Sequence, residues 1–458
     1  MTRHTLVFRI GADDDGASGQ RLSDAHATEL AYASFDELDR QLGNTVGQLH
    51  EMGLQPSDRA LDLAILAAAI TAADTRIGRA TDAQDAWTRE IELCVPVADP
   101  ELWKSISVLL ERTLNFLTGD LWTLAFRGRS ASVEQLIPPI TGDITEKPNA
   151  VCLFSGGLDS FIGAVDLMSA GENILLVSHY WDSVTSKHQG LCLDALQLRY
   201  AKLPFHSIRS RVGFATGTVE GSSSEDTLRG RSFLFFSLAA LAADAIGDDI
   251  TIHVPENGLI SLNVPLDPLR LGALSTRTTH PYYMARFNEI LSALGLTASL
   301  ENRYRHRTKG QMVSECMDQD FLRENAKHTM SCSSPAKMRF SPVEDRRQPK
   351  NCGHCVPCLI RRAALFYGFG QDETDYQLVN LSARALNSES AEGSHVRSFQ
   401  FAISRLMTHP HRAKFDIHKP GPLTDFPGDW AVYEQVYRDG LLEVRQLLEG
   451  VKSKPASA

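Results

Sequence analysis

The chain of 458 residues lacks a long hydrophobic run. Its longest apolar stretch, LDLAILAAAITAA at 61–73, contains Asp62 and is shorter than the roughly 20 apolar residues of a membrane-spanning helix. We therefore expect a buried helix there and no membrane association. The N-terminus, MTRHTLVFRIGADDDG, has no long apolar core and turns acidic where a signal peptide would be cleaved. A cytoplasmic location is the expectation.

The chain also lacks an excess of positive charge. Its 46 Lys and Arg residues are outnumbered by 56 Asp and Glu residues, which gives a formal net charge of -10. This balance argues against a surface built to coat nucleic acid, so nucleic acid is not expected as the main ligand. With 43% apolar and 22% charged residues, the chain is long enough for two or three compact domains with hydrophobic cores.

No catalytic cluster stands out in residues 1–147, which we predict to be an α+β accessory or partner-binding domain. Alternating apolar residues predict strands at 5–10, 89–97 and 121–126, and helical patterns lie between them. Ser34 lies where the N-cap of one such helix is expected. A segment rich in Pro, Gly and Thr, 137–150, reads as the linker to the rest of the chain.

From residue 150 onward, apolar strands alternate with helical segments, which predicts an α/β fold with a doubly wound parallel sheet. The strand candidates are 150–154, 173–182, 204–212 and 249–256. Ligands of such sheets bind at the carboxyl ends of the strands. We assign residues 148–300 to this domain, 301–370 to a metal-binding, substrate-side segment and 371–458 to a helical tail without evident chemistry.

The segment SGGLDS at 155–160 occupies the first loop between a predicted strand and a helix. Its glycines permit positive φ, while its serine hydroxyls and the amides of the helix N-terminus suit a phosphate. It lacks both the Gly-Lys-Ser/Thr ending of a Walker loop and the dinucleotide GxGxxG pattern. A carboxylate among such amides favours ATP with Mg²⁺ over an ordinary turn. The predicted ATP-binding residues here are Ser155, Gly156, Gly157, Leu158, Asp159 and Ser160.

Four of the eight cysteines have the spacing of a metal site. Cys352, Cys355 and Cys358 form two CxxC steps that share a residue, and Cys332 lies twenty residues upstream of the first of them. Four thiolates predict a tetrahedral zinc site, although an iron–sulfur cluster accepts the same ligands. A reducing compartment disfavours disulfides. His354 is an alternative ligand that we expect instead to face solvent.

These motifs together resemble a known family. SGGLDS after a hydrophobic strand resembles the signature of the PP-loop ATP pyrophosphatases, which have a HUP-like fold. GRSFLFFSLAALAA at 230–243, RHRTKGQMV, TMSCSSP and CGHCVPCLIRRAAL follow in the order of the QueC-like 7-cyano-7-deazaguanine synthases. The resemblance covers about 150–367. It departs at Ser232, where the family has Asn, and at HVPENGLI, 253–260, where the substrate-side loop differs.

The added first domain, with AADTRIGRATDAQDAWTREIELCVPV and NFLTGDLW, resembles that of the QatC-type, QueC-like subunits of the Qat anti-phage systems. This resemblance implies a cytoplasmic enzyme of antiviral defence with protein partners from the same operon. It further implies that a 7-deazaguanine is attached to an amine, such as the N-terminus of a partner protein.

The implied chemistry is carboxylate activation, in which a 7-deazaguanine carboxylate attacks the α-phosphate of ATP and an amine captures the acyl adenylate. We expect Asp159, Arg231 and Glu256 to be catalytic. Arg231 would contact phosphate, and Glu256 would recognise the guanine edge or take the proton of the amine. His179 would line the adenine site, with a core histidine as the alternative. The expected cofactors are ATP, Mg²⁺ and Zn²⁺.

Three other functions stay open from the sequence. One is an ordinary 7-cyano-7-deazaguanine synthase of queuosine biosynthesis. Another is a PP-loop tRNA-modifying enzyme, which would need a reactive cysteine or an iron–sulfur cluster. The third is a scaffold subunit that binds ATP without turnover. The basic stretch NRYRHRTK at 302–309 is expected to be a solvated face. Oligomeric state is left open, a homo-oligomer included.

Overall fold

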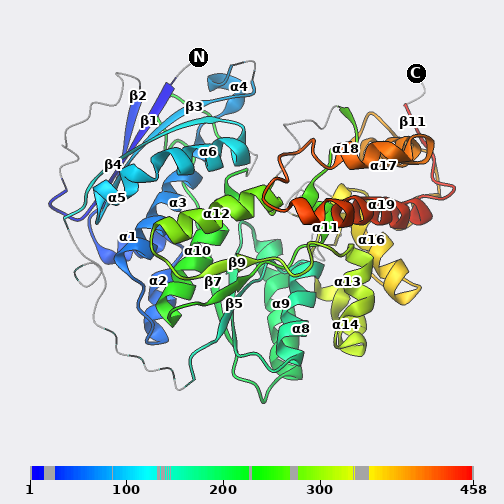
Figure 1. The fold of residues 1–458 in the computed structure, drawn as a ribbon, viewed down its shortest axis with the longest axis horizontal. Coiled ribbons are helices and arrows are strands. Elements are labelled where there is room, and N and C mark those ends of the chain that lie inside the picture. The colour runs from blue at the N-terminus through cyan, green and yellow to red at the C-terminus, as the bar shows by residue number, and fades with distance from the viewer. Residues whose placement is uncertain are drawn as a thin grey trace.

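The computed structural model describes residues 3–14, 26–84, 86–130, 146–225, 229–268, 277–333 and 350–455, together with residues 135, 140, 142, 144 and 335. The chain has an α/β architecture with two larger parallel sheets and a C-terminal group of helices. These three parts follow one another along the longest axis of the molecule (Figure 1). Among the helices of these residues, none combines the length and the apolar character that crossing a membrane requires.

The N-terminal sheet has four strands in the order β2 (His26–Tyr32), β1 (Arg3–Ile10), β3 (Glu90–Val97) and β4 (Leu121–Gly128). All three strand pairs are parallel, so this unit is of α/β type and differs from the α+β organisation expected from the sequence. Alternating apolar residues indicate a strand and its buried face, but they carry no information on its direction. Direction is set by the connections between strands, which helices make here between β2 and β3 and between β3 and β4.

The apolar stretch at 61–73 lies in helix α3 (Asp58–Arg76), as predicted. Ser57 caps this helix by accepting a hydrogen bond from the amide of Ala60. Every residue from 60 to 75 is buried, because α3 packs on the N-terminal sheet and against α10 (Arg231–Ile246) of the second sheet. One hydrophobic core therefore runs from the first sheet through both helices to the second sheet.

The second sheet has five parallel strands in the order β7 (His206–Ser210), β6 (Ile174–His179), β5 (Ala150–Leu153), β8 (Thr251–His253) and β9 (Ser299–Glu301). In chain order the sheet begins with the central strand β5 and continues outward through β6 to β7. The chain then crosses to β8, on the other side of β5. The strand order therefore reverses between β5 and β8. Four strands were predicted, whereas β9 is too short for its alternation to be recognised.

Helices cover both faces of this sheet. Val151 and Leu153 of β5 join the core shared with α3 and α10, whereas Cys152 and Phe154 point into a second core with α8 and α9. The first face is completed by α12 (Pro281–Ala293), and the second is formed by α8 (Leu158–Ser169) and α9 (Ser183–Arg199). The two-residue alternation of β5 thus divides its side chains between two cores, as expected for a doubly wound sheet.

The C-terminal part is helical and packs around a third core. Its main helices are α16 (Val356–Phe369), α17 (Ala391–Thr408) and α19 (Trp430–Leu447), and α19 also contacts α11 (Gly258–Leu262), which follows β8. The remaining elements are α1 (Phe35–Gln41), α2 (Thr45–Glu51), α4 (Arg79–Asp82), α5 (Pro100–Ser105), α6 (Ser107–Thr118), α13 (Lys309–Glu315), α14 (Gln319–Asn325), α18 (Ala413–Asp416), the short strands β10 (Leu386–Asn387) and β11 (Ser453–Lys454), and 3₁₀ turns at Ala326–His328, Pro410–Arg412 and Pro427–Asp429.

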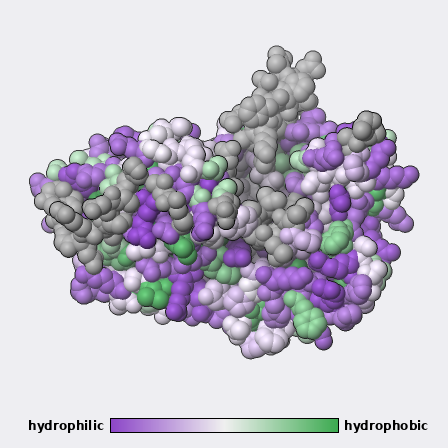
Figure 2. All heavy atoms as spheres, turned by 90° about the horizontal axis from the view of Figure 1, so that it is seen from above, coloured by the Kyte–Doolittle hydropathy of each residue, from purple (hydrophilic) through white to green (hydrophobic). Residues whose placement is uncertain are grey.

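The face shown in Figure 2 is mostly hydrophilic where it is coloured, with hydrophobic residues in small separate groups.

Candidate functional site

A cleft of about 460 Å³ opens at the carboxyl ends of β5 and β8, where the strand order reverses. The SGGLDS loop follows β5, and residues 254–257 follow β8. The reversal point of an open parallel sheet is where ligands of this fold class bind. Side chains that line the cleft include Ser155, Asp159, Arg231, Glu256, Lys309 and Cys332.

The SGGLDS loop turns sharply into helix α8. Gly156 has φ of 78°, and a Cβ there would lie 2.9 Å from Cγ of Gln189, so the turn requires glycine. The hydroxyl of Ser155 accepts a hydrogen bond from the amide of Gly157 at 3.3 Å and lies 3.1 Å from that of Ser160. Gly157 caps α8 without a side-chain hydrogen bond. The N-terminus of α8, where the helix dipole is positive and backbone amides are free, therefore lies at a loop of the kind that binds anions.

Asp159, in the first turn of α8, is the centre of a buried polar network. Lys309 Nζ lies 3.1 Å from its Oδ1, and Asn257 donates to its Oδ2 from the side chain at 2.7 Å and from the backbone at 3.2 Å. Burial alone would raise the pKa of Asp159, but Lys309 and the hydrogen bonds from Glu256 and Asn257 lower it below its usual value. Asp159 is therefore ionised.

Glu256 has the opposite character. Burial and the neighbouring charge of Asp159 raise the pKa of Glu256 well above its usual range. Contact between the two carboxyl groups moves their pKa values in opposite directions, down for Asp159 and up for Glu256, so that a proton on the pair favours Glu256. Asn302 fixes the backbone here by donating to the carbonyl of Glu256 at 2.8 Å. The cleft wall thus holds two neighbouring carboxyl groups of opposite character, Glu256 with a raised pKa and Asp159 with a lowered pKa.

The sequence analysis missed Lys309 as a site residue. The Thr308-Lys309-Gly310 segment was recognised only as part of the RHRTKGQMV motif. In the structure Thr308 and Gln311 form a capping box that begins α13 at Lys309, and the lysine side chain is 4% exposed. The spacing of Thr308 and Gln311 was a visible signal for a helix start. Asn257 was missed as well, because no local pattern marks an amide that reaches another loop.

Arg231 begins α10 and lines the cleft, so it is not a surface arginine. Its guanidinium donates to the carbonyl of His179 at 3.4 Å. Burial lowers the pKa of Arg231, and the nearby Asp182 partly opposes this. Asp182, at the N-cap of α9, also lines the cleft. A cation and an acid therefore face the cleft from two different helix starts.

His179, at the end of β6, is fully buried. Its ring centroid lies 6.1 Å from that of Trp181 and 6.4 Å from that of Phe235. Burial, together with the charge of Arg231, lowers the pKa of His179 to about 3, so the ring is neutral. Its carbonyl accepts hydrogen bonds from Gln189 and Arg231. In this packing the residue is a core histidine whose backbone orients the arginine of the cleft, while Trp181 lines the cleft itself.

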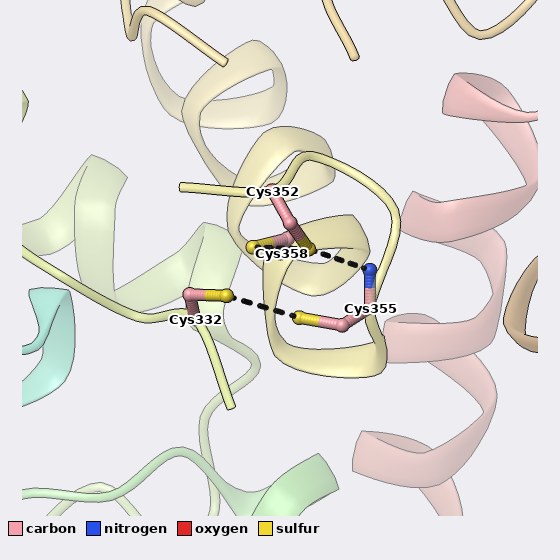
Figure 3. Close-up of side chains that lie close together, drawn as sticks. All are labelled: Cys332, Cys352, Cys355 and Cys358. Atoms are coloured by element: carbon pink, nitrogen blue, oxygen red, sulfur yellow. Dashed lines mark hydrogen bonds between the residues drawn. The ribbon is translucent and has the colours of Figure 1, made fainter. Parts of the chain in front are cut away.

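The four predicted cysteines converge on one point (Figure 3). Their sulfur atoms all lie within 4.8 Å of one another, with Cys352 and Cys358 at 3.7 Å and Cys332 and Cys355 at 4.0 Å. Zinc–sulfur bonds of about 2.3 Å in a tetrahedron place sulfur atoms roughly 3.8 Å apart. The cluster therefore has the dimensions and the ligand chemistry of a zinc site.

The other four cysteines lie outside this cluster, and the four-sulfur group does not include His354, whose side chain instead hydrogen-bonds to Cys352 at its edge. All eight cysteines are free, and Cys94, Cys152, Cys192 and Cys316 are buried. Burial raises the pKa of Cys152 to about 12, which makes its thiol a poor nucleophile. The ring of His354 stacks on that of His395, with centroids 6.4 Å apart.

The cysteine cluster adjoins the cleft through the segment at 329–333. The amide of Met330 donates to the carbonyl of Gly156 at 2.8 Å, and the amide of Leu158 donates to the hydroxyl of Ser331 at 3.4 Å. Asn351, next to the first cysteine of the CxxC pair, accepts from the amide of Ser331 at 3.0 Å. A metal bound by the four cysteines would therefore hold one wall of the cleft against the SGGLDS loop.

The Gly- and Ser-rich composition of residues 217–230 predicts a mobile loop that could close over a ligand. Its described part, 217–225, instead lies on the N-terminal unit. The hydroxyl of Ser222 accepts from the amide of Gly78 at 3.1 Å, and the amide of Glu225 donates to the carbonyl of Thr75 at 3.0 Å. Residues 226–228 lie outside the described residues, as do residues 137–139, 141, 143 and 145 of the expected linker.

Comparison of the chain with models of known protein families gave no match, and neither did a search of curated proteins. The function of the site must therefore be argued from its geometry and from the motifs of the chain.

Proposed function

We propose that the chain is an ATP-dependent carboxylate-activating enzyme of the QueC-like PP-loop class. The observation that carries this proposal is the buried network of Asp159, Glu256 and Lys309 at the start of α8, in a cleft that the SGGLDS loop also lines. A cation, an ionised carboxylate and a proton-bearing acid beside a phosphate-type loop are the groups that adenylation needs.

The proposed substrate is a 7-deazaguanine carboxylate, which the motif order from 150 to 367 favours. One carboxylate oxygen bonds to the α-phosphorus of ATP, and the bond to the β-phosphate bridging oxygen breaks, releasing pyrophosphate. An amine then attacks the acyl carbon, and AMP leaves with the bonding electrons while the amine loses its proton. The proposed acceptor is the N-terminus of a partner protein in anti-phage defence.

Each group of the cleft has a role in this scheme. The amides of the loop and the hydroxyls of Ser155 and Ser160 hold the departing pyrophosphate, and Lys309 and Arg231 neutralise its growing charge. Glu256 exchanges its proton with the reacting groups. Asp159 keeps Lys309 oriented and is the ionised carboxylate that suits Mg²⁺ bound to ATP phosphates. Mg²⁺ supplies further charge neutralisation when it is bound.

The proposed role of the metal at the four cysteines is structural. Four thiolates close the tetrahedral shell of zinc, and no position is left for a substrate. The segment at 329–333 connects this centre to the loop by three hydrogen bonds described above. The tRNA-modifying alternative has less support, because the buried Cys152 has a raised pKa and lies within a strand.

The test is incubation of the purified chain with ATP, Mg²⁺ and 7-carboxy-7-deazaguanine, with and without the proteins encoded beside it, while AMP, pyrophosphate and intact protein masses are followed. AMP together with a mass increase on a partner supports the proposal in full. AMP with a free nitrile identifies an ordinary synthase. Asp159→Asn should abolish AMP release, and Asp194→Asn, at an exposed position on α9, is the matched control. No AMP under any condition overturns the proposal.

A further inference from the structure

Glu443, on the C-terminal helix α19, reaches the turn that carries Lys309. Its side chain is buried, and the hydroxyl of Thr308 donates to its Oε1. The amide of Gly310 donates to its Oε2 at 3.2 Å. A Cβ on Gly310 would lie only 2.6 Å from Oε1, so this turn and the carboxylate fit closely. Both bonds come from the residues that flank Lys309.

The hydroxyl of Thr308 is engaged on two sides. It accepts from the amide of Gln311 at 3.0 Å in the capping box, and it donates to Glu443. Lys309 lies between these anchored residues, and its Nζ lies 3.1 Å from Oδ1 of Asp159. A continuous path of hydrogen bonds and one ion pair thus joins α19 to the first turn of α8.

A contribution to the stability of the fold does not by itself explain why Glu443 is buried at this position. Within the residues that the structure describes, the ion pairs formed by Lys, Arg and His do not include Glu443, and the nearest acidic neighbour, Asp439, has the same charge. Burying a carboxyl group without a cation costs free energy that two hydrogen bonds offset only in part. That cost is understandable where the group must hold a turn in one position.

We propose that Glu443 is a positioning residue that holds the Thr308–Gly310 turn so that Lys309 stays on Asp159 and on the phosphates that leave. This inference rests on the proposed function, since it concerns the same cleft. It gives the helical tail a part in the site, whereas the sequence showed no chemistry there. It also requires α19 to be packed against the start of α13 before the cleft can carry out the proposed reaction.

The test compares Glu443→Ala and Glu443→Gln with the control Glu434→Ala. Glu434 lies on the same helix and pairs with Arg438 at its partly exposed surface. Two readouts are used: pyrophosphate release with 7-carboxy-7-deazaguanine, and the rate at which an amine-acylating reagent labels Lys309, read by peptide mass spectrometry. The second readout needs no activity, so it decides the inference even if the proposed function fails.

We expect Glu443→Ala to lower kcat about 10- to 100-fold, because a displacement of about 1 Å in a positioned group has effects of this size. Labelling of Lys309 should become several-fold faster, and Glu443→Gln should restore part of both properties. In the background of Lys309→Met, Glu443→Ala should cause no further loss, since the two residues act as a unit.

Unchanged Lys309 labelling in a folded Glu443→Ala protein overturns the inference, as does full additivity with Lys309→Met. If Glu443→Ala does not fold, Thr308→Val removes the same hydrogen bond with less change in volume, with Thr308→Ser as its control. Faster labelling in Thr308→Val alone supports the inference, and equal labelling in both variants overturns it.

Discussion

The amide of Gly230 donates a hydrogen bond of 2.8 Å to the Asp74 carboxylate, and this bond ties helix α3 of the N-terminal unit to the residue before Arg231. Asp74 also accepts from the buried guanidinium of Arg89 at 2.8 Å, and Arg89 pairs with Asp120 at 2.6 Å. The start of α10, and with it one cation of the cleft, is thus held by a charge network of the N-terminal unit.

Asp74→Ala should destabilise the fold by about 3–5 kcal/mol, because it leaves part of the buried charge of Arg89 uncompensated. Urea unfolding followed by circular dichroism measures this. The control is Glu101→Ala, which removes an exposed pair with Lys104 and should change stability by less than about 1 kcal/mol. Equal effects of the two substitutions would contradict the role of the network.

Lys309→Met should reduce pyrophosphate release at least about 100-fold, because the departing phosphates and Asp159 lose their shared cation. The protein should remain folded, which thermal unfolding checks. Lys350→Met is the matched control, since Lys350 pairs at the surface with Asp375. Full activity in Lys309→Met would remove Lys309 from the proposed mechanism.

Cys358→Ser should lose the bound metal, and Cys94→Ser should keep it, because only the first belongs to the cluster of four sulfur atoms. Elemental analysis should find close to one zinc per chain in the wild type. Iron with visible absorbance would instead identify an iron–sulfur cluster and favour the tRNA-modifying alternative. Loss of metal should also weaken ATP binding, because the segment at 329–333 holds the SGGLDS loop.

Glu443→Gln should change how stability depends on pH. Burial raises the pKa of Glu443 from its usual value of 4.5 to about 7 in the folded chain. Between these values the folded chain keeps a proton that the unfolded chain has lost, so this group makes stability fall as pH rises, by up to about 3 kcal/mol. Glutamine does not titrate, so the variant should gain stability relative to the wild type between pH 5 and pH 7.

Urea unfolding of both proteins at several pH values measures this difference, and the other titrating groups cancel because the two proteins share them. Glu434→Gln, at a partly exposed position on the same helix, should give a curve parallel to that of the wild type. A parallel curve for Glu443→Gln would show that Glu443 keeps its ordinary pKa.

Predictions made from short sequence patterns agree with the structure for features that depend on residues close together in the chain. The parallel strands after residue 150 and the convergence of four cysteines were predicted from alternation and from spacing. The α+β organisation predicted for the N-terminal unit differs from its parallel sheet, because strand patterns do not encode direction. His179 was predicted to line the adenine site, with a core histidine as the alternative, and its fully buried ring agrees with the alternative.

Residues that act across long sequence separations could not be found in the same way. Lys309 and Asp159 meet only because α13 packs beside α8, and Glu443 meets Thr308 only because α19 returns to α13. Each residue looks ordinary within its own segment. Tertiary packing brings these residues together, so the contact between the helical tail and the Thr308–Gly310 turn could not be predicted segment by segment.

The packing of α3 against α10 also bears on how such a chain can be divided or recombined. The apolar side chains of α3 and α10 bury one another. A gene fragment that begins after the N-terminal unit would therefore encode a protein in which an apolar face of α10 is exposed. Exchange of the N-terminal unit between related chains would succeed only if the surface of the new α3 were complementary to the α10 against which it packs. The two sheets therefore depend on one shared hydrophobic core, although each has strands of its own.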